Sequence, residues 1–324
     1  MPSAVFVQTG CRLHFGLLAV QAEAGRNFGG VGLMIGSPNC EVLVHRNDHD
    51  EIVSSAELAP RIAEWRDRIR NAIERDSTSM PVRIELHREL PGHAGLGSGT
   101  QMALALATAM NAIAGNSTIA AIELASQVGR GRRSAIGIHG FQRGGFLVEA
   151  GKRRDEEVSP LVASLSFPAE WRILLASPKS ALGLSGDAER QAFVRLGAMP
   201  RSVTEKLCRI ALMDMLPAIA AADFQATSES LFEFGRLNGE YFAPVQGGLF
   251  ADPRAASLAD WLRTAGCMAV GQSSWGPSLF ALLPNSAEAE RFQHEITQSS
   301  LGNDFNIQIT QARNGGATVT PELK

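Results

Sequence analysis

Apolar residues recur along the chain with two different periods, which together predict a mixture of strands and helices. In residues 82–86 apolar and polar positions alternate, as in a strand with one buried face. In residues 58–74 apolar residues recur at every third or fourth position, which predicts a helix with one apolar side. Residues 100–114 are rich in alanine and apolar on every side, so we expect a buried helix there.

The same patterns predict the remaining elements and their grouping. Further strands are expected at residues 4–9, 40–45, 145–148, 171–176, 268–270, 278–283 and 306–310. Further helices are expected at residues 119–130, 188–196, 203–222, 224–238, 258–265 and 287–299. The composition changes after a charged turn at residues 151–157, so we divide the chain into domains of residues 1–160 and 161–324. The fold class expected from this order is α+β.

Composition and charge narrow the range of functions. With 324 residues, 45% apolar residues and a net charge of −3, the chain is a globular protein large enough for two cores. Because nothing is strongly basic overall, we expect no nucleic-acid partner. No apolar run reaches the ~20 residues of a membrane helix, and the first residues do not resemble a signal peptide, so we expect a cytoplasmic protein. The four cysteines lack metal-site spacing, and we expect them to be reduced.

The sharpest chemical signal is a glycine-rich loop between a predicted strand and a predicted helix. It reads Pro91-Gly-His-Ala-Gly95-Leu-Gly97-Ser-Gly99-Thr100. Glycines let a backbone approach an anion closely, and the helix start offers free N–H groups and a positive dipole end. We predict a di- or triphosphate site made of Gly95, Leu96, Gly97, Ser98, Gly99 and Thr100. The spacing matches neither a Walker A loop nor a Rossmann loop, and a plain turn capped by Ser98 is the alternative.

This loop resembles the phosphate loop of the GHMP kinase superfamily, which has Pro-x-x-x-Gly-Leu-Gly-Ser before an alanine-rich helix. Two more glycine-rich stretches, residues 134–145 and 270–281, lie where that family has its other signatures. The resemblance implies a two-domain α+β fold, with an N-terminal phosphate-loop domain and a ferredoxin-like C-terminal domain. In many of the kinases an Asp of the middle stretch acts near the attacking hydroxyl. Gly137 stands at that position here, so that carboxylate is missing.

Several longer blocks resemble one branch of the superfamily, the β-ribofuranosylaminobenzene 5′-phosphate synthase family. These blocks are Arg12-Leu-His14-Phe-Gly16, Gly183-Leu-Ser-Gly186-Asp-Ala-Glu189, Gly239-Glu-Tyr241-Phe-Ala-Pro-Val-Gln246 and Gly271-Gln272-Ser-Ser-Trp275-Gly-Pro277. The resemblance implies that phosphoribosyl pyrophosphate is joined to 4-aminobenzoate or 4-hydroxybenzoate. Pyrophosphate and CO₂ leave, in an early step of methanopterin-type cofactor biosynthesis. The resemblance also implies Mg²⁺, no redox cofactor and a homodimer.

Individual residues suit parts of this reaction. Arg12 and His14 share one face of an extended segment, and we predict that they act in catalysis by binding an anion and transferring a proton. Arginines can hold a phosphate or carboxylate, and aromatic rings can stack on the benzoate. The predicted substrate-binding residues are Arg26, Arg133, Arg143, Tyr241, Gln246, Gln272, Ser273 and Trp275. We interpret Glu149 as a solvent-side strand residue; the alternative is a partner of Mg²⁺ or of a ribose hydroxyl.

Two other functions remain open at this point. One is an ATP-dependent small-molecule kinase of the same superfamily, against which Gly137 argues. The other is a non-catalytic GHMP-fold protein that binds a phosphorylated ligand. The glycine-rich loop by itself does not separate such a binding protein from an enzyme.

Overall fold

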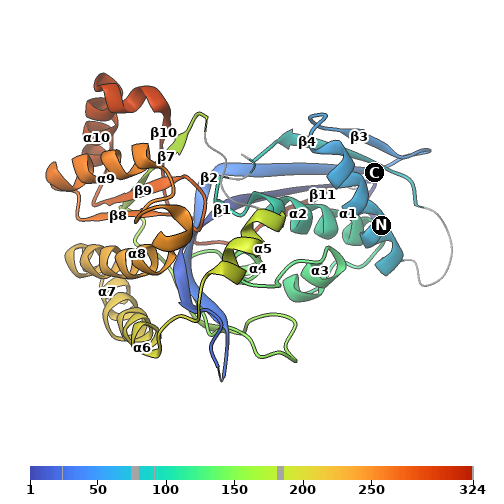
Figure 1. Ribbon diagram of the computed structural model, residues 1–324. Coiled ribbons are helices and arrows are strands. Elements are labelled where there is room, and N and C mark those ends of the chain that lie inside the picture. The colour runs from blue at the N-terminus through green and yellow to red at the C-terminus, as the bar shows by residue number, and fades with distance from the viewer. Residues whose placement is uncertain (24, 74–79, 91, 93, 181–185, 323–324) are drawn as a thin grey trace.

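The computed structural model describes residues 1–23, 25–73, 80–90, 92, 94–180 and 186–322, which form two sheets covered by helices (Figure 1). The first sheet has seven strands and the second has four. The described residues contain no helix that is long and apolar enough to cross a membrane. All four cysteines are free, as expected from their spacing.

Two long antiparallel strands form the centre of the first sheet. These are β1 (Ala4–Ala19) and β2 (Phe28–Arg46), both much longer than the short strands expected at residues 4–9 and 40–45. The order is β11-β1-β2-β4-β3, and β5 pairs with both β2 and β6. The shorter strands are β3 (Glu51–Val53), β4 (Val82–Arg88), β5 (Phe146–Glu149), β6 (Leu161–Leu165) and β11 (Thr318–Glu322). Because β1 continues past its bulges, Arg12 and His14 lie within this strand rather than after it.

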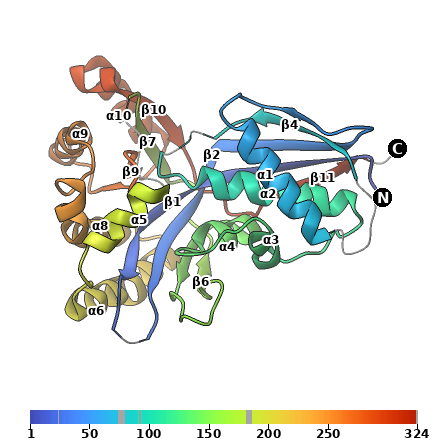
Figure 2. The same ribbon diagram turned by 45° about the vertical axis from the view of Figure 1, so that its right-hand side comes forward.

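Four helices lie against the first sheet. They are α1 (Ala59–Ile73), α2 (Ser98–Ile113), α3 (Ala121–Gln127) and α4 (Ile136–Arg143) (Figure 2). Helix α2 is buried, as its all-round apolar sequence predicts, and packs on β1, β2 and the other three helices. Helix α4 was not expected, because its segment is rich in glycine. A Cβ on Gly140 would lie 2.4 Å from the Met34 sulfur, so glycine lets α4 pack close to β2.

The second sheet is antiparallel, in the order β10-β7-β9-β8. Its strands are β7 (Arg172–Pro178), β8 (Ala269–Gln272), β9 (Leu279–Leu283) and β10 (Phe305–Thr310). The helices of the C-terminal half of the chain are α5 (Gly186–Arg195), α6 (Arg201–Arg209), α7 (Leu216–Ala220), α8 (Phe224–Gln246), α9 (Pro253–Thr264) and α10 (Ser286–Gln298). This half also contains the π-helix η1 (Ile210–Met215) and the 3₁₀-helix η2 (Ser300–Asp304). The single helix expected at residues 203–222 is therefore α6, η1 and α7 in succession.

The path of the chain does not divide simply at residue 160. Strands β6 and β11 come after that position in the sequence, yet both belong to the first sheet. Strand β11 pairs with β1, which places the two chain ends at the same end of that sheet (Figure 1). All five residues of β11 are exposed, so it has no buried face to produce the alternating pattern by which strands are recognised.

The two halves meet where two glycine-rich loops touch backbone to backbone. A Cβ on Gly276 would lie 2.3 Å from the Cα atom of Gly95, and a Cβ on Gly95 would lie 2.3 Å from the carbonyl oxygen of Ser273. No real side-chain carbon fits at such distances. The close approach of the phosphate loop and the loop between β8 and β9 therefore requires glycine at both positions.

We predict that Gly276→Ala lowers the free energy of unfolding by about 1–3 kcal/mol, because the methyl group must push the two loops apart. Gly235→Ala is the matched control, since Gly235 lies within α8 with no other atom within 4 Å of its added Cβ. That change should stabilise the protein by about 0.5–1 kcal/mol. Urea unfolding of the three proteins measures both effects, and equal stability of Gly276→Ala and the parent would contradict the required contact.

Candidate active site between the two sheets

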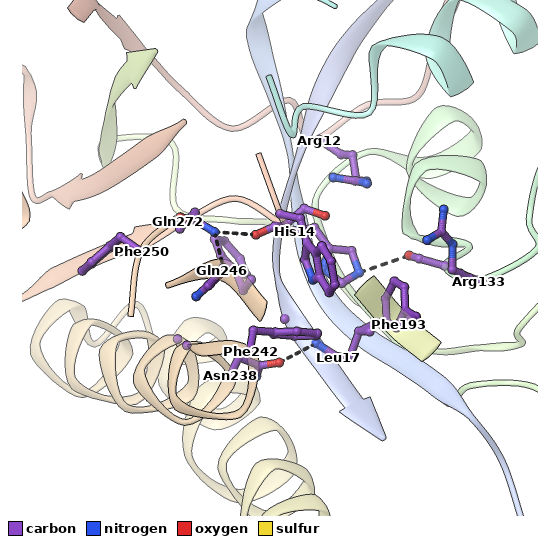
Figure 3. Close-up of a pocket in the computed structure, with 18 of the residues that line it drawn as sticks. Arg12, His14, Leu17, Arg133, Phe193, Asn238, Phe242, Gln246, Phe250 and Gln272 are labelled. Carbon is purple, nitrogen blue, oxygen red and sulfur yellow. Dashed lines mark hydrogen bonds between the residues drawn. The ribbon is translucent and has the colours of Figure 1, made fainter. Parts of the chain in front are cut away.

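A cavity of about 340 Å³ lies between the two halves of the molecule. Its walls come from β1, the start of α2, the segment before α4, α5, α8 and the loop after β8. Figure 3 shows Arg12 and Arg133 at one end of the cavity, and Gln246 and Phe250 at the other. The cavity therefore joins segments that are far apart in the sequence.

Arg12 lies against the predicted phosphate loop. Its backbone N–H donates to the carbonyl of Leu96 at 3.0 Å, and its Nη1 donates to the carbonyl of Gly95 at 3.0 Å. Gly97 has a left-handed φ of 71° and begins α2, and a Cβ there would lie 2.8 Å from Cγ of Arg12. No side chain of a described residue caps this helix end, so the expected alternative of a turn capped by Ser98 is not observed. Thr100, in the first turn of α2, lines the cavity.

Two further arginines flank the same helix start, and neither is among the site residues predicted from the sequence. A Cβ on Gly99 would lie 2.7 Å from Nη2 of Arg61 and 3.1 Å from Nη2 of Arg130. Both guanidinium groups lie over the ring of Trp65, at 4.9 and 5.3 Å from its centre. Burial, and then repulsion from Arg61, lowers the pKa of Arg130 to about 10.

These two cations lie beside the positive end of a helix dipole, and neither has an ion pair with a described carboxylate. Such an arrangement favours a ligand with several negative charges, such as a diphosphate. Arg61 precedes α2 in the sequence and Arg130 follows it, so only the fold shows that the two guanidinium groups lie together.

A second polar cluster connects His14, Ser134 and Glu149. The Ser134 hydroxyl lies 2.6 Å from Oε1 of Glu149 and 3.2 Å from Nε2 of His14. The backbone N–H of Ala135 donates to Oε2 of Glu149 at 2.7 Å. His14 and Ser134 line the cavity, and Glu149 lies behind them.

The interpretation of Glu149 as a solvent-side residue was wrong. Its side chain is fully buried, because β5 is flanked by β2 and β6 and covered by α4. Burial raises the pKa of Glu149 above its usual 4.5, although its hydrogen bonds with Ser134 and Ala135 act in the opposite direction. Burial lowers the pKa of His14 well below its usual 6.5, and the nearby Arg12 adds to this effect. His14 is therefore a neutral imidazole at neutral pH.

Aromatic side chains form a less polar part of the wall. Trp275 stacks on Phe193 with ring centres 4.8 Å apart, and Phe242 meets it edge-on at 5.0 Å. The guanidinium of Arg133 lies 5.2 Å from the centre of the Phe193 ring. All four residues line the cavity, so a flat aromatic ligand would find both apolar surface and a cation there.

Three other predicted residues support the loops of the site. Gln272 lines the cavity, accepts from the N–H of Ala251 at 2.7 Å and donates to the carbonyl of Ser274 at 3.0 Å. Gln246 also lines the cavity. The buried Ser273 does not line it, but its hydroxyl connects β1 to the phosphate loop.

Three predicted substrate-binding residues lie away from the cavity. Arg26 forms an ion pair with Glu156 at 2.6 Å, which uses the guanidinium that was expected to hold a substrate carboxylate. Arg143 is exposed at the end of α4. The hydroxyl of Tyr241 donates to the carbonyl of Gly197 at 2.7 Å, and Tyr241 is not among the residues that line the cavity.

A protein-made magnesium cage does not fit the site. The described part of the chain has no group of three or more His, Cys, Asp or Glu side chains placed to hold a metal ion. Glu149, which lies behind the cavity wall, is already hydrogen-bonded by Ser134 and Ala135. The residues present suit an anion better than a cation.

Comparison with solved structures shows the fold. Homoserine kinase from Cytophaga hutchinsonii superimposes with a TM-score of 0.65 over 99% of this chain and 98% of that one, at 16% identity. Mevalonate diphosphate decarboxylase from Staphylococcus aureus gives a TM-score of 0.67 over 99% and 98%, at 18% identity. The two-domain α+β fold predicted from the sequence is confirmed.

Comparison of sequences identifies the family. The models described as "GHMP kinases N terminal domain" and "GHMP kinases C terminal" match residues 64–141 and 215–301. The protein named β-ribofuranosylphenol 5′-phosphate synthase in Methanothermobacter thermautotrophicus is 33% identical, over 86% of this chain and 88% of that protein. The protein of the same name in Archaeoglobus fulgidus is 28% identical, over 97% and 98%. The chain belongs to the β-ribofuranosylphenol 5′-phosphate synthase family of the GHMP kinase superfamily.

Proposed function

We propose that this protein is a transferase that joins phosphoribosyl pyrophosphate to a 4-substituted benzoate, with release of pyrophosphate and CO₂. The name of the relatives, β-ribofuranosylphenol 5′-phosphate synthase, describes a ribosylated phenol as product. That product corresponds to 4-hydroxybenzoate as the acceptor, the second of the two acids expected from the sequence. The reaction belongs to methanopterin-type cofactor biosynthesis.

The observation that best supports this proposal is the pairing of an anion site with an aromatic wall in one cavity. Arg12, Arg130 and Thr100 at the start of α2 line this cavity, and so do Phe242 and Trp275. In many of the kinases a carboxylate lies near the attacking hydroxyl. The corresponding residue here is Gly137, whose added Cβ would lie 3.3 Å from Nε2 of Gln101 and 3.4 Å from Thr100.

The cationic side suits departure of pyrophosphate. As the bond from the ribose to pyrophosphate breaks, negative charge grows on the leaving group and positive charge on the sugar. Arg12, Arg130 and Thr100 line the cavity. In this proposal they stabilise the leaving group together with the adjoining N–H groups at Gly97–Gly99 and the guanidinium of Arg61, which lies beside Gly99. These donors are held in position before the reaction, so little reorganisation is needed during it.

The aromatic side suits the acceptor. The ring must lie flat so that its carboxyl-bearing carbon faces the anomeric carbon of the sugar. Phe242 and Trp275 offer apolar surface for this, and Arg133 offers a cation for the carboxylate. Arg26 is not included among the residues proposed to bind the carboxylate, because its guanidinium forms an ion pair with Glu156.

Magnesium remains part of the proposal as a companion of the substrate. A Mg²⁺ ion is commonly held by phosphate oxygens, water and only one or two protein ligands, which agrees with the lack of an acidic cluster in the described chain. The ion would supply positive charge to the diphosphate, and no step proposed here passes through it. The cytoplasmic location, the homodimer and the absence of a redox cofactor also remain proposals.

We expect the purified protein to release labelled CO₂ when it is incubated with Mg²⁺, phosphoribosyl pyrophosphate and carboxyl-labelled 4-hydroxybenzoate. Gly97→Asp should abolish release, because it places a negative charge and a strained φ at the phosphate loop. Gly315→Asp is the control, since Gly315 is exposed with no atom within 4 Å of an added Cβ. No release with either benzoate, together with ATP consumption in the presence of another acceptor, would identify a kinase instead.

We also expect Arg130→Ala to raise KM for phosphoribosyl pyrophosphate by about tenfold to a hundredfold, because a hydrogen bond to a charged group contributes about 1.5–3 kcal/mol. The KM for the benzoate should change little. Arg201→Ala, which alters an arginine side chain that is 92% exposed on α6, should leave both values unchanged. Steady-state kinetics with each substrate varied in turn measures these constants, and an unchanged KM in Arg130→Ala would remove this residue from the diphosphate site.

A further inference from the structure

His14, Ser134 and Glu149 form a hydrogen-bonded series that leads from the cavity into the core. Each comes from a different segment: His14 from β1, Ser134 from the segment before α4, and Glu149 from β5. Glu149 is 0% exposed and His14 is 3% exposed, whereas Ser134 is half-buried at the cavity wall. A fully buried carboxylate is costly to keep, so its connection to the cavity calls for an explanation.

The direction of the hydrogen bonds follows from the number of protons available. When Glu149 is ionised, Ala135 N–H donates to one of its oxygens and the Ser134 hydroxyl donates to the other. A serine hydroxyl has only one proton, so Ser134 must then accept from Nε2–H of His14. This assigns the neutral His14 ring a bare Nδ1. That atom is buried and has no hydrogen-bond partner among the described residues.

We infer that His14, Ser134 and Glu149 form a proton relay that removes the proton of the acceptor's 4-hydroxyl group through Nδ1 of His14 and stores it on Glu149. The inference rests on the proposed function and adds two residues, Ser134 and Glu149, to it. His14 is the catalytic residue in this scheme, because it contacts the acceptor. Ser134 and Glu149 act through it.

The proton and electron balance of the step is complete. The 4-hydroxyl proton passes to Nδ1 as the Nε2 proton passes to Ser134 and the Ser134 proton passes to Glu149. The electron pair left on the oxygen flows through the ring, its C1 bonds to the anomeric carbon, and the pyrophosphate leaves with the pair of the broken C–O bond. The C1–carboxyl bond then breaks, CO₂ leaves, and that pair restores the aromatic ring and the oxygen anion. The proton returns along the same path.

The electrostatics explain why the proton passes through His14 rather than remaining on it. Burial lowers the pKa of His14, and an imidazolium would also lie next to Arg12 on β1, in a cavity that Arg130, Arg132 and Arg133 line as well. Gly30 of β2 lies beside the ring and carries no charge, since a Cβ there would lie 3.0 Å from Nε2 of His14. Burial raises the pKa of Glu149, which favours the protonated form of its carboxyl group.

The test compares two acceptors that differ in the acidity of the 4-hydroxyl group. Fluorine atoms beside that hydroxyl lower its pKa, so 3,5-difluoro-4-hydroxybenzoate reaches the enzyme already ionised. With 4-hydroxybenzoate, Ser134→Ala and Glu149→Gln should each lower kcat by about 100-fold, the usual contribution of a positioned acid or base. With the difluoro acid, both variants should turn over within a few fold of the parent enzyme. The KM for phosphoribosyl pyrophosphate should not change.

The control variant is Glu41→Gln, which removes a half-buried carboxylate of β2 that lies outside the cavity and should keep parental rates with both acceptors. If Glu149→Gln does not fold, Ser134→Ala alone decides the result. Equal losses with both acceptors, or no loss with either, would overturn the relay while the proposed function stands. A parent enzyme that releases no CO₂ from either acid would overturn the proposed function and the relay with it.

Discussion

The close backbone contact between Gly95 and Gly276 is the constraint on which the rest of the site depends. The hydroxyl of Ser273 stabilises this contact. It accepts from the N–H of His14 at 3.1 Å and donates to the carbonyl of Gly95 at 2.9 Å. The N–H of Ser274 then donates to the carbonyl of His14 at 2.8 Å. These bonds hold β1, the phosphate loop and the loop after β8 against one another, so the positions of Arg12 and His14 follow from them.

A second contact closes the site from the side of α8. Asn238 accepts from the N–H of Leu17 at 2.9 Å, and a Cβ on Gly16 would lie 2.3 Å from the amide carbon of Asn238. Helix α8 therefore packs on β1 as well as on β8. Because it touches both sheets, α8 can place Phe242 and Gln246 opposite the arginines of the N-terminal half. The cavity is lined by both cationic and aromatic side chains, which suit the two proposed substrates.

The GHMP fold is retained here with a different distribution of charged groups. Gly137 in α4 stands where many of the kinases have a carboxylate near the attacking hydroxyl, whereas Glu149 connects to the site from β5 through Ser134. Arg61 and Arg130 add positive charge at the start of α2. Fold similarity at 16–18% identity shows architecture alone, and the chemistry depends on these individual side chains.

The sequence by itself determined the elements with strong periodicity, such as α1, α2 and β4, and the glycine-rich loop with its position before a helix. It also placed Arg12 and His14 among the candidate residues, because they share one face within a block that resembles the synthase family, and Trp275, because its bulky ring lies between glycine-rich segments. Tertiary structure alone decided that Glu149 is buried, that Arg26 pairs with Glu156, and that Arg61 and Arg130 meet beside Gly99. Local patterns report how each residue relates to its neighbours in the chain. Burial, ion pairing and the directions of shared protons depend on segments that only the folded chain brings together.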